Sequence, residues 1–213
     1  MNTAVPLHSW HLGRDAMGLS QIIEPEFNLA AWTREPNPVI EAYLNRVFEH
    51  VGINLRTVYS LDTLSEELLA SLPEGEGKSA FVEDVHLLAE MLCCLFDCNS
   101  FGLRLTPMTQ AMCPKFHVDN IQVRLVCTYI GKGTQWLPNS VVNREKLGKG
   151  SGGMEDHLSG LYPDNLIIPQ LESFDVALLK GEAWHDEGGK GLVHRSCPMA
   201  EGEQRMLLTL DPM

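Results

Sequence analysis

Hydrophobic positions in the first half of the chain recur with the period of an α-helix. Over residues 39–51 the apolar side chains fall three and four positions apart, which places them on one face of a helix. Asn37 is a residue type that caps helix starts, and Pro38 suits the first helical position. Gly52 follows the last apolar residue and suits the end of the helix. The pattern therefore predicts an amphipathic helix that begins at Pro38.

Two further helices are predicted in the same half of the chain. A short one covers 62–72, with leucines on its inward face, and a longer one runs from a cap at Ser79 to about Cys98. The segment 73–78 between them combines Pro, Gly and Glu, a composition typical of a loop. Residues 1–36 show no sustained period and are expected to form an ordered arm with a few short turns. The first hundred residues are thus expected to be mainly helical.

After Asn99 the hydrophobic period changes to two, which is the period of a β-strand. Apolar and polar residues alternate over 101–106 and again over 122–130. The second of these strands is expected to turn four side chains to one face of a sheet: those of Val123, Leu125, Cys127 and Tyr129. Further short strands are predicted at 135–137, 166–168, 176–179, 192–195 and 206–210.

Many short strands that follow a helical half are typical of a β-barrel or a β-sandwich with helices packed outside it. The sequence contains no internal repeat and no interdomain linker. We therefore expect an α+β protein in which 1–99 form an arm and helices that pack on a β-domain formed by 100–213. The glycine-rich segment 139–164 is expected to be a long mobile loop, and such loops are often lids.

Composition and charge exclude several classes of protein. The chain has 213 residues, of which 44% are hydrophobic and 21% are charged, as in an ordinary globular protein. Its formal net charge of −12 argues against non-specific binding to nucleic acid, which requires a basic surface. Residues 1–18 lack the pattern of a signal peptide, and no apolar run is long enough to predict a membrane span. The six cysteines form no disulfide framework, so we expect free thiols in the cytoplasm.

Candidate chemistry is concentrated just before the strand at 122–130. His117 and Asp119 are separated by one residue, so in an extended segment both side chains point to the same side. Two histidines and one carboxylate on one face form the facial triad of non-haem iron(II) sites, in which the other coordination positions stay open for chemistry. His194, in a predicted strand near the C-terminus, is our candidate for the second histidine.

The sequence His117-Val118-Asp119, followed by His194 and then Arg205 on later predicted strands, resembles the motif of Fe(II)/2-oxoglutarate-dependent oxygenases. The resemblance implies their fold, a double-stranded β-helix, which is a jelly-roll barrel like that of cupins, here with an N-terminal helical layer. It covers roughly residues 100–211. The whole chain is also similar to an uncharacterised bacterial family with a domain-of-unknown-function label, and this likeness implies no activity.

The resemblance implies a role for each matching residue. His117, Asp119 and His194 would bind Fe(II). Arg205 would pair with the far carboxylate of 2-oxoglutarate, because a guanidinium group can donate two parallel hydrogen bonds to a carboxylate. A salt bridge from Arg205 to a glutamate at 201 or 203 is the alternative.

Other cosubstrate contacts are not fixed by the motif. The family often has Ser or Thr two residues after the arginine, where this chain has Leu207, and Thr209 is the nearest hydroxyl in the same alternation. The candidates for a second cosubstrate-binding residue are Arg124, Thr128 and Tyr129.

Three more residues are candidates for lining the site: His185, Trp136 and Trp184. The alternative is a loop histidine beside a turn and two tryptophans of the hydrophobic core. The acidic cluster at 155–157 lies in the glycine-rich segment and is expected to be solvated.

A structural zinc site is a further alternative. Cys113 and His117 have a spacing that zinc sites use, and Cys93, Cys94 and Cys98 form a second group. The second group falls on a largely apolar predicted helix, where free cysteine usually behaves as a small hydrophobic residue.

Three functions remain for comparison with the structure. The first is a non-haem iron dioxygenase that uses 2-oxoglutarate and O2 to hydroxylate or demethylate a small-molecule or protein substrate. The second is a cupin-like protein that holds zinc or another divalent ion for homeostasis, sensing or a non-oxidative reaction. The third is a catalytically inert interaction module. Ligand type does not separate the first two, because histidine and carboxylate bind Fe, Mn, Ni and Zn alike. Arg205 separates them, since only the first requires it to bind 2-oxoglutarate.

Overall fold

Alternation along the strands decides which face of the main sheet packs against helices. In β5 (Val123–Ile130) the odd-numbered side chains, from Val123 to Tyr129, join the largest hydrophobic cluster together with the buried side of α3 (Lys78–Phe96). Val126, on the other face of the strand, belongs to a second cluster. The computed structural model describes residues 8–51, 55–184 and 191–213.

The main sheet contains seven strands. With β5 they are β1 (Trp10–Gly13), β2 (Leu29–Trp32), β3 (Leu55–Ser60), β4 (Ser100–Met108), β7 (Val176–Lys180) and β9 (Arg205–Pro212). Their spatial order is β1-β2-β7-β5-β9-β4-β3, in which β1 and β2 are parallel and every other neighbouring pair is antiparallel. A second, two-stranded sheet pairs β6 (Gln135–Leu137) with β8 (Val193–Arg195).

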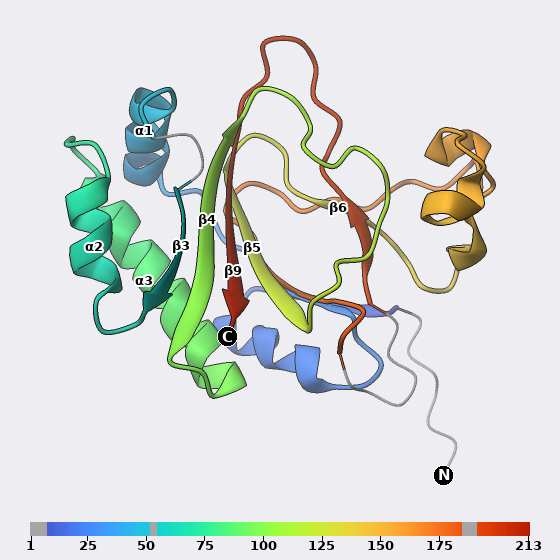
Figure 1. Cartoon of the computed structure of the whole chain (residues 1–213), viewed down its shortest axis with the longest axis horizontal. Helices are drawn as coiled ribbons and strands as arrows, with labels where there is room; N and C mark the ends of the chain where they lie inside the picture. The colour runs from blue at the N-terminus through green and yellow to red at the C-terminus, as the bar shows by residue number, and fades with distance from the viewer. Residues whose placement is uncertain (1–7, 52–54, 185–190) are drawn as a thin grey trace.

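The two faces of the main sheet are covered differently (Figure 1). Helices α1 (Pro38–Val47), α2 (Leu64–Ser71) and α3 gather on one side, where α1 contacts β5 and α3 contacts β4 and β9. The small sheet lies on the other side, where Trp136 and Leu192 pack with Val126 and Ala177 of the main sheet. A short 3-10 helix, η1 (Ala16–Ile23), contacts β2 and β7. Two sheets thus face one another across an apolar cluster.

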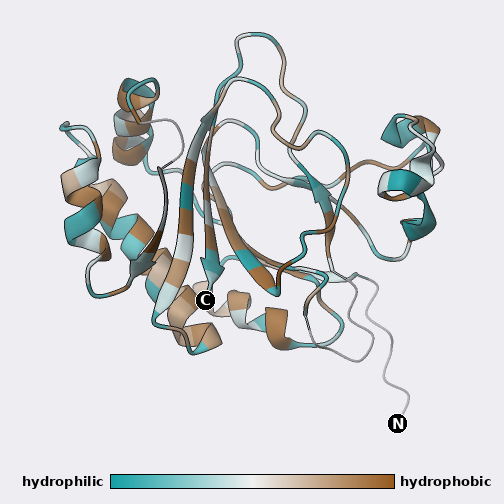
Figure 2. Cartoon of the chain, viewed as in Figure 1, coloured by the Kyte–Doolittle hydropathy of each residue, from teal (hydrophilic) through white to brown (hydrophobic). Residues whose placement is uncertain are grey.

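Hydropathy follows this arrangement. Figure 2 shows hydrophobic and hydrophilic bands alternating along β4 and β9, as expected for strands whose two faces have different surroundings. Within the described ranges, no helix is long and apolar enough to cross a membrane.

The predicted helices are present, with shifted ends. The Asn37 side chain accepts hydrogen bonds from the backbone N–H groups of Val39 and Ile40, which confirms the predicted cap of α1. The helix ends at Val47, before the predicted stop at Gly52, which lies outside the described residues. The cap of α3 is Gly77, in the left-handed conformation, so the prediction of Ser79 as the cap was wrong.

The expectation of a helical first hundred residues was wrong in one respect, because three strands of the main sheet come from that part of the chain. β1 and β2 form one edge of the sheet, and β3 forms the other. Conversely, a strand was predicted at 166–168, but these residues form none. The other predicted strands all have a counterpart in the structure.

Residues 139–164 contain ordered secondary structure and not only loop. They form η2 (Arg144–Lys146), η3 (Gly148–Ser151) and η4 (Asp156–Leu158), which stand at the far side of the small sheet from α1–α3 (Figure 1). The surrounding segment packs on the outer face of this sheet in a third cluster: Phe116, Leu137, Leu161 and Val193.

One ion pair ties α3 to the main sheet. Arg34 donates to both carboxylate oxygens of Asp84 at 2.6 and 3.1 Å, and the Tyr129 hydroxyl donates to the same carboxylate at 2.6 Å. The side chains of Arg34 and Asp84 are only 10% and 14% exposed, so each charge depends on the other for compensation. Tyr129 packs edge-on against Phe81 of α3 and against Phe174.

We predict that Asp84→Ala lowers the free energy of unfolding by about 3–5 kcal/mol, because it leaves the Arg34 guanidinium buried without a counter-charge. Denaturant-induced unfolding followed by circular dichroism measures the change. Glu83→Ala is the matched control, since Glu83 precedes Asp84 on the same helix but is exposed. Equal stability of the two variants would contradict the assignment of Asp84 as the anchor of α3.

Candidate metal centre

Two histidines that are far apart in the sequence are joined through their backbones. The N–H of His117 donates to the carbonyl of His194 at 3.0 Å, and the N–H of His194 donates to the carbonyl of His117 at 2.9 Å. This antiparallel bridge continues the small sheet, in which His194 pairs on its other side with Trp136. The imidazole rings therefore lie side by side, with centroids 4.6 Å apart.

Local carbonyl groups fix how both rings are turned. Nδ1 of His117 lies 2.9 Å from the carbonyl oxygen of Lys115, and Nδ1 of His194 lies 3.1 Å from that of Leu192. A carbonyl oxygen can only accept, so in each ring Nδ1 carries the proton and donates it. The neutral imidazole then presents the lone pair of Nε2, which is the atom that binds a metal. In each case the backbone carbonyl two residues before the histidine therefore holds the ring in the tautomer that can bind a metal.

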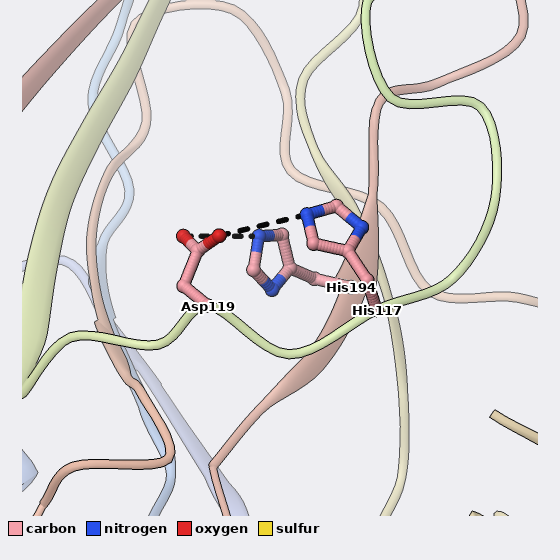
Figure 3. Close-up of side chains that lie close together, drawn as sticks. All are labelled: His117, Asp119 and His194. Atoms are coloured by element: carbon pink, nitrogen blue, oxygen red, sulfur yellow. Dashed lines mark ion pairs between the residues drawn. The ribbon is translucent and has the colours of Figure 1, made fainter. Parts of the chain in front are cut away.

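Asp119 completes the cluster, as Figure 3 shows. Its Oδ1 lies 3.6 Å from Nε2 of His117, and its Oδ2 lies 3.6 Å from Nε2 of His194. The three ligand atoms lie within 4.8 Å of one another. Among the described residues this is the only group of three or more His, Cys, Asp or Glu side chains arranged to hold a metal ion. The cysteine-based zinc sites considered above are therefore not formed there.

A second carboxylate supports Asp119 through an arginine. Arg124 donates from Nη1 to Oδ2 of Asp119 at 2.7 Å, and from Nε and Nη2 to the two oxygens of Asp211, each at 2.7 Å. All three guanidinium nitrogens are thus engaged by protein carboxylates. Arg124 is therefore placed to orient Asp119.

Electrostatics favour the metal-binding protonation states of Asp119 and His194. Burial raises the pKa of Asp119, but the interaction with His117 and the positive charges of His194 and Arg124 outweigh it and hold this pKa at about 2. Burial lowers the pKa of His194 to about 4. The interaction with Asp119 raises the pKa of His117 against the opposing effect of burial. At neutral pH Asp119 is a carboxylate and His194 is neutral, and these forms bind metals.

Arg205 lies in the interior, and no acidic side chain of the described residues pairs with it. Its side chain comes from β9, the residue is 1% exposed, and Nη2 donates to the hydroxyls of Thr128 and Thr134 at 3.2 and 3.1 Å. Within the described part of the chain, Nε and Nη1 have no hydrogen-bond partner. Burial lowers the pKa of Arg205 to about 10, still well above neutral. Glu203, the suggested alternative partner, pairs with Lys132.

The turn after β5 brings Thr134 to Arg205. Gly131 has a φ of +80°, and a Cβ there would collide with the carbonyl oxygen of Gln204, the residue before Arg205. Only glycine suits both the left-handed backbone and this close approach. The turn can therefore lie directly against the start of β9.

A cavity of about 510 Å³ opens on the metal-binding cluster. All three residues of the cluster line it, and so do Arg124 and Thr134. The rest of its wall comes from both sheets and the 112–113 segment: Arg104, Thr106, Met112, Cys113, Val126, Arg195, Ser196, Leu207 and Thr209.

Asp156 ties the η2–η4 segment to both strands that carry the histidines. It is 8% exposed, and its Oδ2 accepts the backbone N–H of Phe116 at 2.8 Å and lies 3.7 Å from Nη1 of Arg195. The Arg195 guanidinium stacks on the Phe116 ring at 4.3 Å. The expectation of a solvated cluster at 155–157 was therefore wrong for Asp156. Hydrophobic periodicity in the sequence did not indicate the burial of Asp156, because the contacts that bury it join a loop residue to distant strands.

The remaining predicted residues fall in several places. Thr128 contacts Arg205, as described above. Tyr129 faces α3 and not the cavity, because it lies on the odd-numbered side of β5. Trp184 lies edge-on against Phe96, at the cluster under the helices. Trp136 is buried between the sheets on the side of His194. His185 lies outside the described residues.

The sequence matches one family model over residues 13–211, described as Protein of unknown function (DUF1826). The chain belongs to this family. No curated protein sequence matches it.

Solved structures with the same fold are Fe(II)/2-oxoglutarate-type oxygenases. Apo HygX from Streptomyces hygroscopicus superimposes on this member of the family with a TM-score of 0.54 at 11% identity, covering 93% of this chain and 87% of that one. HygX with nickel and 2-oxoglutarate bound gives 0.50 at the same identity and coverage. A prolyl-4-hydroxylase from Pseudomonas putida gives 0.48 at 10% identity, covering 92% and 97%. The resemblance seen in the sequence is confirmed at the level of fold, which for these enzymes is a jelly roll.

We predict that Asp211→Asn weakens divalent metal binding by about tenfold or more. Without the negative charge of Asp211, the guanidinium of Arg124 would interact more strongly with Asp119 and would compete with the metal for its carboxylate. Zinc competition against a chromophoric chelator measures the dissociation constant. Asp62→Asn, at an exposed position, controls for the loss of one negative charge. Unchanged zinc affinity in Asp211→Asn would show that Asp119 needs no support from β9.

Proposed function

We propose that this protein is a non-haem iron(II) dioxygenase that uses 2-oxoglutarate and O2 to hydroxylate or demethylate its substrate. The observation that carries the proposal is Arg205, a buried guanidinium with two nitrogens that have no partner among the described residues; its partner Thr134 lines the cavity that opens on the His-Asp-His cluster. A buried charge without a counter-ion is costly, so the site calls for an anionic ligand.

The metal ligands would be Nε2 of His117, one oxygen of Asp119 and Nε2 of His194. This donor set fits Fe(II), because two neutral imidazoles and a carboxylate form a facial triad and leave positions for the cosubstrate and O2. When bound, iron and 2-oxoglutarate would supply the oxidising power for the reaction. The protein holds the ligating tautomers and neutralises Asp119 through Arg124.

The far carboxylate of 2-oxoglutarate would bind Arg205. Nε and Nη1 are the free donors, and Thr128 and Thr134 hold Nη2 from the other side. We reassign Arg124 from cosubstrate binding to the orientation of Asp119, since its three nitrogens are occupied. Tyr129 is no longer a candidate for cosubstrate binding, because its side chain faces α3.

We further propose that the two facing sheets form the double-stranded β-helix of these enzymes. Residues 100–213 would form the domain that carries the site, and the helices of 1–99 would buttress it from outside. The N-terminal part would not fold alone, because β1, β2 and β3 pair into the shared sheet, where β1 and β3 are its two edges. All six cysteines are free, which suits a reducing cytoplasm.

An anaerobic titration of 2-oxoglutarate into Fe(II)-loaded protein tests the function. We expect a weak visible metal-to-ligand charge-transfer band in the wild type and none in His117→Ala, which removes a ligand. In Arg205→Lys the metal content should stay unchanged while the 2-oxoglutarate dissociation constant rises by about tenfold to a hundredfold, because lysine keeps the charge and loses the planar fork.

Arg46→Lys, an exposed substitution on α1, is the matched control and should behave as wild type. Undiminished 2-oxoglutarate affinity in Arg205→Lys would refute the assigned role of Arg205. Tight metal binding without a band would favour the cupin-like metal-binding protein. Absence of metal binding in the wild type would exclude both.

A further inference from the structure

Arg104 lies at the cavity wall, and the acidic side chain near it, that of Asp211, is shared with Arg124. Arg104 lies on β4, and its Nη2 is 3.5 Å from Oδ2 of Asp211, while its side chain is 38% exposed. Both oxygens of Asp211 already accept hydrogen bonds from Arg124 at 2.7 Å. No hydrogen bond from the Arg104 side chain is present among the described residues. Its donors are therefore available to a ligand in the cavity.

A second unpartnered group lies beside it. Thr209 on β9 is the direct strand partner of Arg104 on β4, and both line the cavity. The residue is 8% exposed, and no described residue forms a hydrogen bond with its Oγ1. A buried hydroxyl normally has one, so this oxygen points independently to a polar ligand at the same place.

This pair is separate from the proposed 2-oxoglutarate carboxylate site. Arg205 and Thr209 lie on the same strand, four residues apart, which corresponds to about 13 Å between their Cα atoms. On β4 the partner of Arg205 is Met108, which is likewise four residues from Arg104. Arg104 and Thr209 line the cavity on the metal-binding cluster, whereas Arg205 meets that cavity only through its partner Thr134.

Charge balance indicates which anion fits. With iron(II) and the 2-oxoglutarate dianion bound, and with only the described residues around the site counted, the negative charges are those of Asp119, Asp211 and the cosubstrate. The positive charges are those of iron and of Arg104, Arg124 and Arg205, and they exceed the negative ones by a single charge. Arg195 does not alter this balance because Asp156 is its partner. One surplus positive charge matches a carboxylate better than a phosphate monoester, which carries close to two negative charges at neutral pH.

We infer that Arg104 and Thr209 bind a carboxylate group of the substrate, so that the enzyme acts on a small carboxylic acid. This inference rests on the proposed function, because the surplus charge arises only with metal and cosubstrate in place. A guanidinium fork and a hydroxyl together satisfy one carboxylate. A cavity of about 510 Å³ falls in the range of small-molecule sites. In a chain of net charge −12, an arginine whose acidic neighbour is already engaged by Arg124 also selects anions locally.

The test uses zinc-loaded protein saturated with 2-oxoglutarate, because zinc holds the site without redox turnover. Hexanoate and its uncharged analogue hexanamide are titrated as probes and followed by ligand-detected NMR. We expect hexanoate to bind about tenfold or more tightly than hexanamide. Arg104→Gln should remove this preference and leave 2-oxoglutarate affinity unchanged. Arg46→Gln, the same charge change at the exposed α1 position, should retain it.

The outcomes separate the two proposals. If the wild type fails to bind zinc or 2-oxoglutarate, the proposed function fails, and the inference fails with it. If both bind but hexanoate shows no advantage over hexanamide, or keeps its advantage in Arg104→Gln, only the inference is overturned. Tighter binding of hexyl phosphate than of hexanoate would overturn the carboxylate assignment. If Arg104→Gln does not fold, Thr209→Val decides, with an expected loss of about threefold to tenfold in hexanoate affinity.

Discussion

The site depends on one backbone bridge, the pair of reciprocal hydrogen bonds between His117 and His194. It brings together two residues from distant parts of the sequence and sets both rings on one side of the small sheet. The carbonyl groups of Lys115 and Leu192 then fix which nitrogen of each ring is free. Because these constraints come from backbone atoms, the geometry requires no metal to hold the two histidines together.

Around this bridge several buried charges are compensated in pairs. Asp211 and Asp119 share Arg124, and further away Asp84 compensates Arg34 at the junction with α3. Arg205 has neither an acid nor a full set of acceptors among the described residues. Under the proposed function, the metal ligands are positioned by pairing, and the cosubstrate anchor is left unpaired for its ligand.

Local patterns in the sequence predicted the parts of this structure that local physics determines. The cap at Asn37 and the alternation along β5 were confirmed, because both depend on neighbours within a few residues. The four-residue strands β1 and β2 are too short to show a period, and only their pairing makes them strands: β1 pairs with β2, and β2 pairs with β7. Asp156 was misjudged for the same reason, since its burial depends on Phe116 and Arg195, which are remote in sequence. The His-x-Asp spacing pointed to the cluster, but the roles of Arg124 and Tyr129 required the strand register, which turns one into the cavity and the other toward α3.

The most direct test of the central claim is a crystal structure of the Fe(II) and 2-oxoglutarate complex, grown without oxygen and analysed at the iron absorption edge. The anomalous signal should place iron between Nε2 of His117, Nε2 of His194 and the carboxylate of Asp119. The far carboxylate of 2-oxoglutarate should lie on Nε and Nη1 of Arg205. Iron bound elsewhere, or a cosubstrate that leaves Arg205 without a partner, would contradict the assignment.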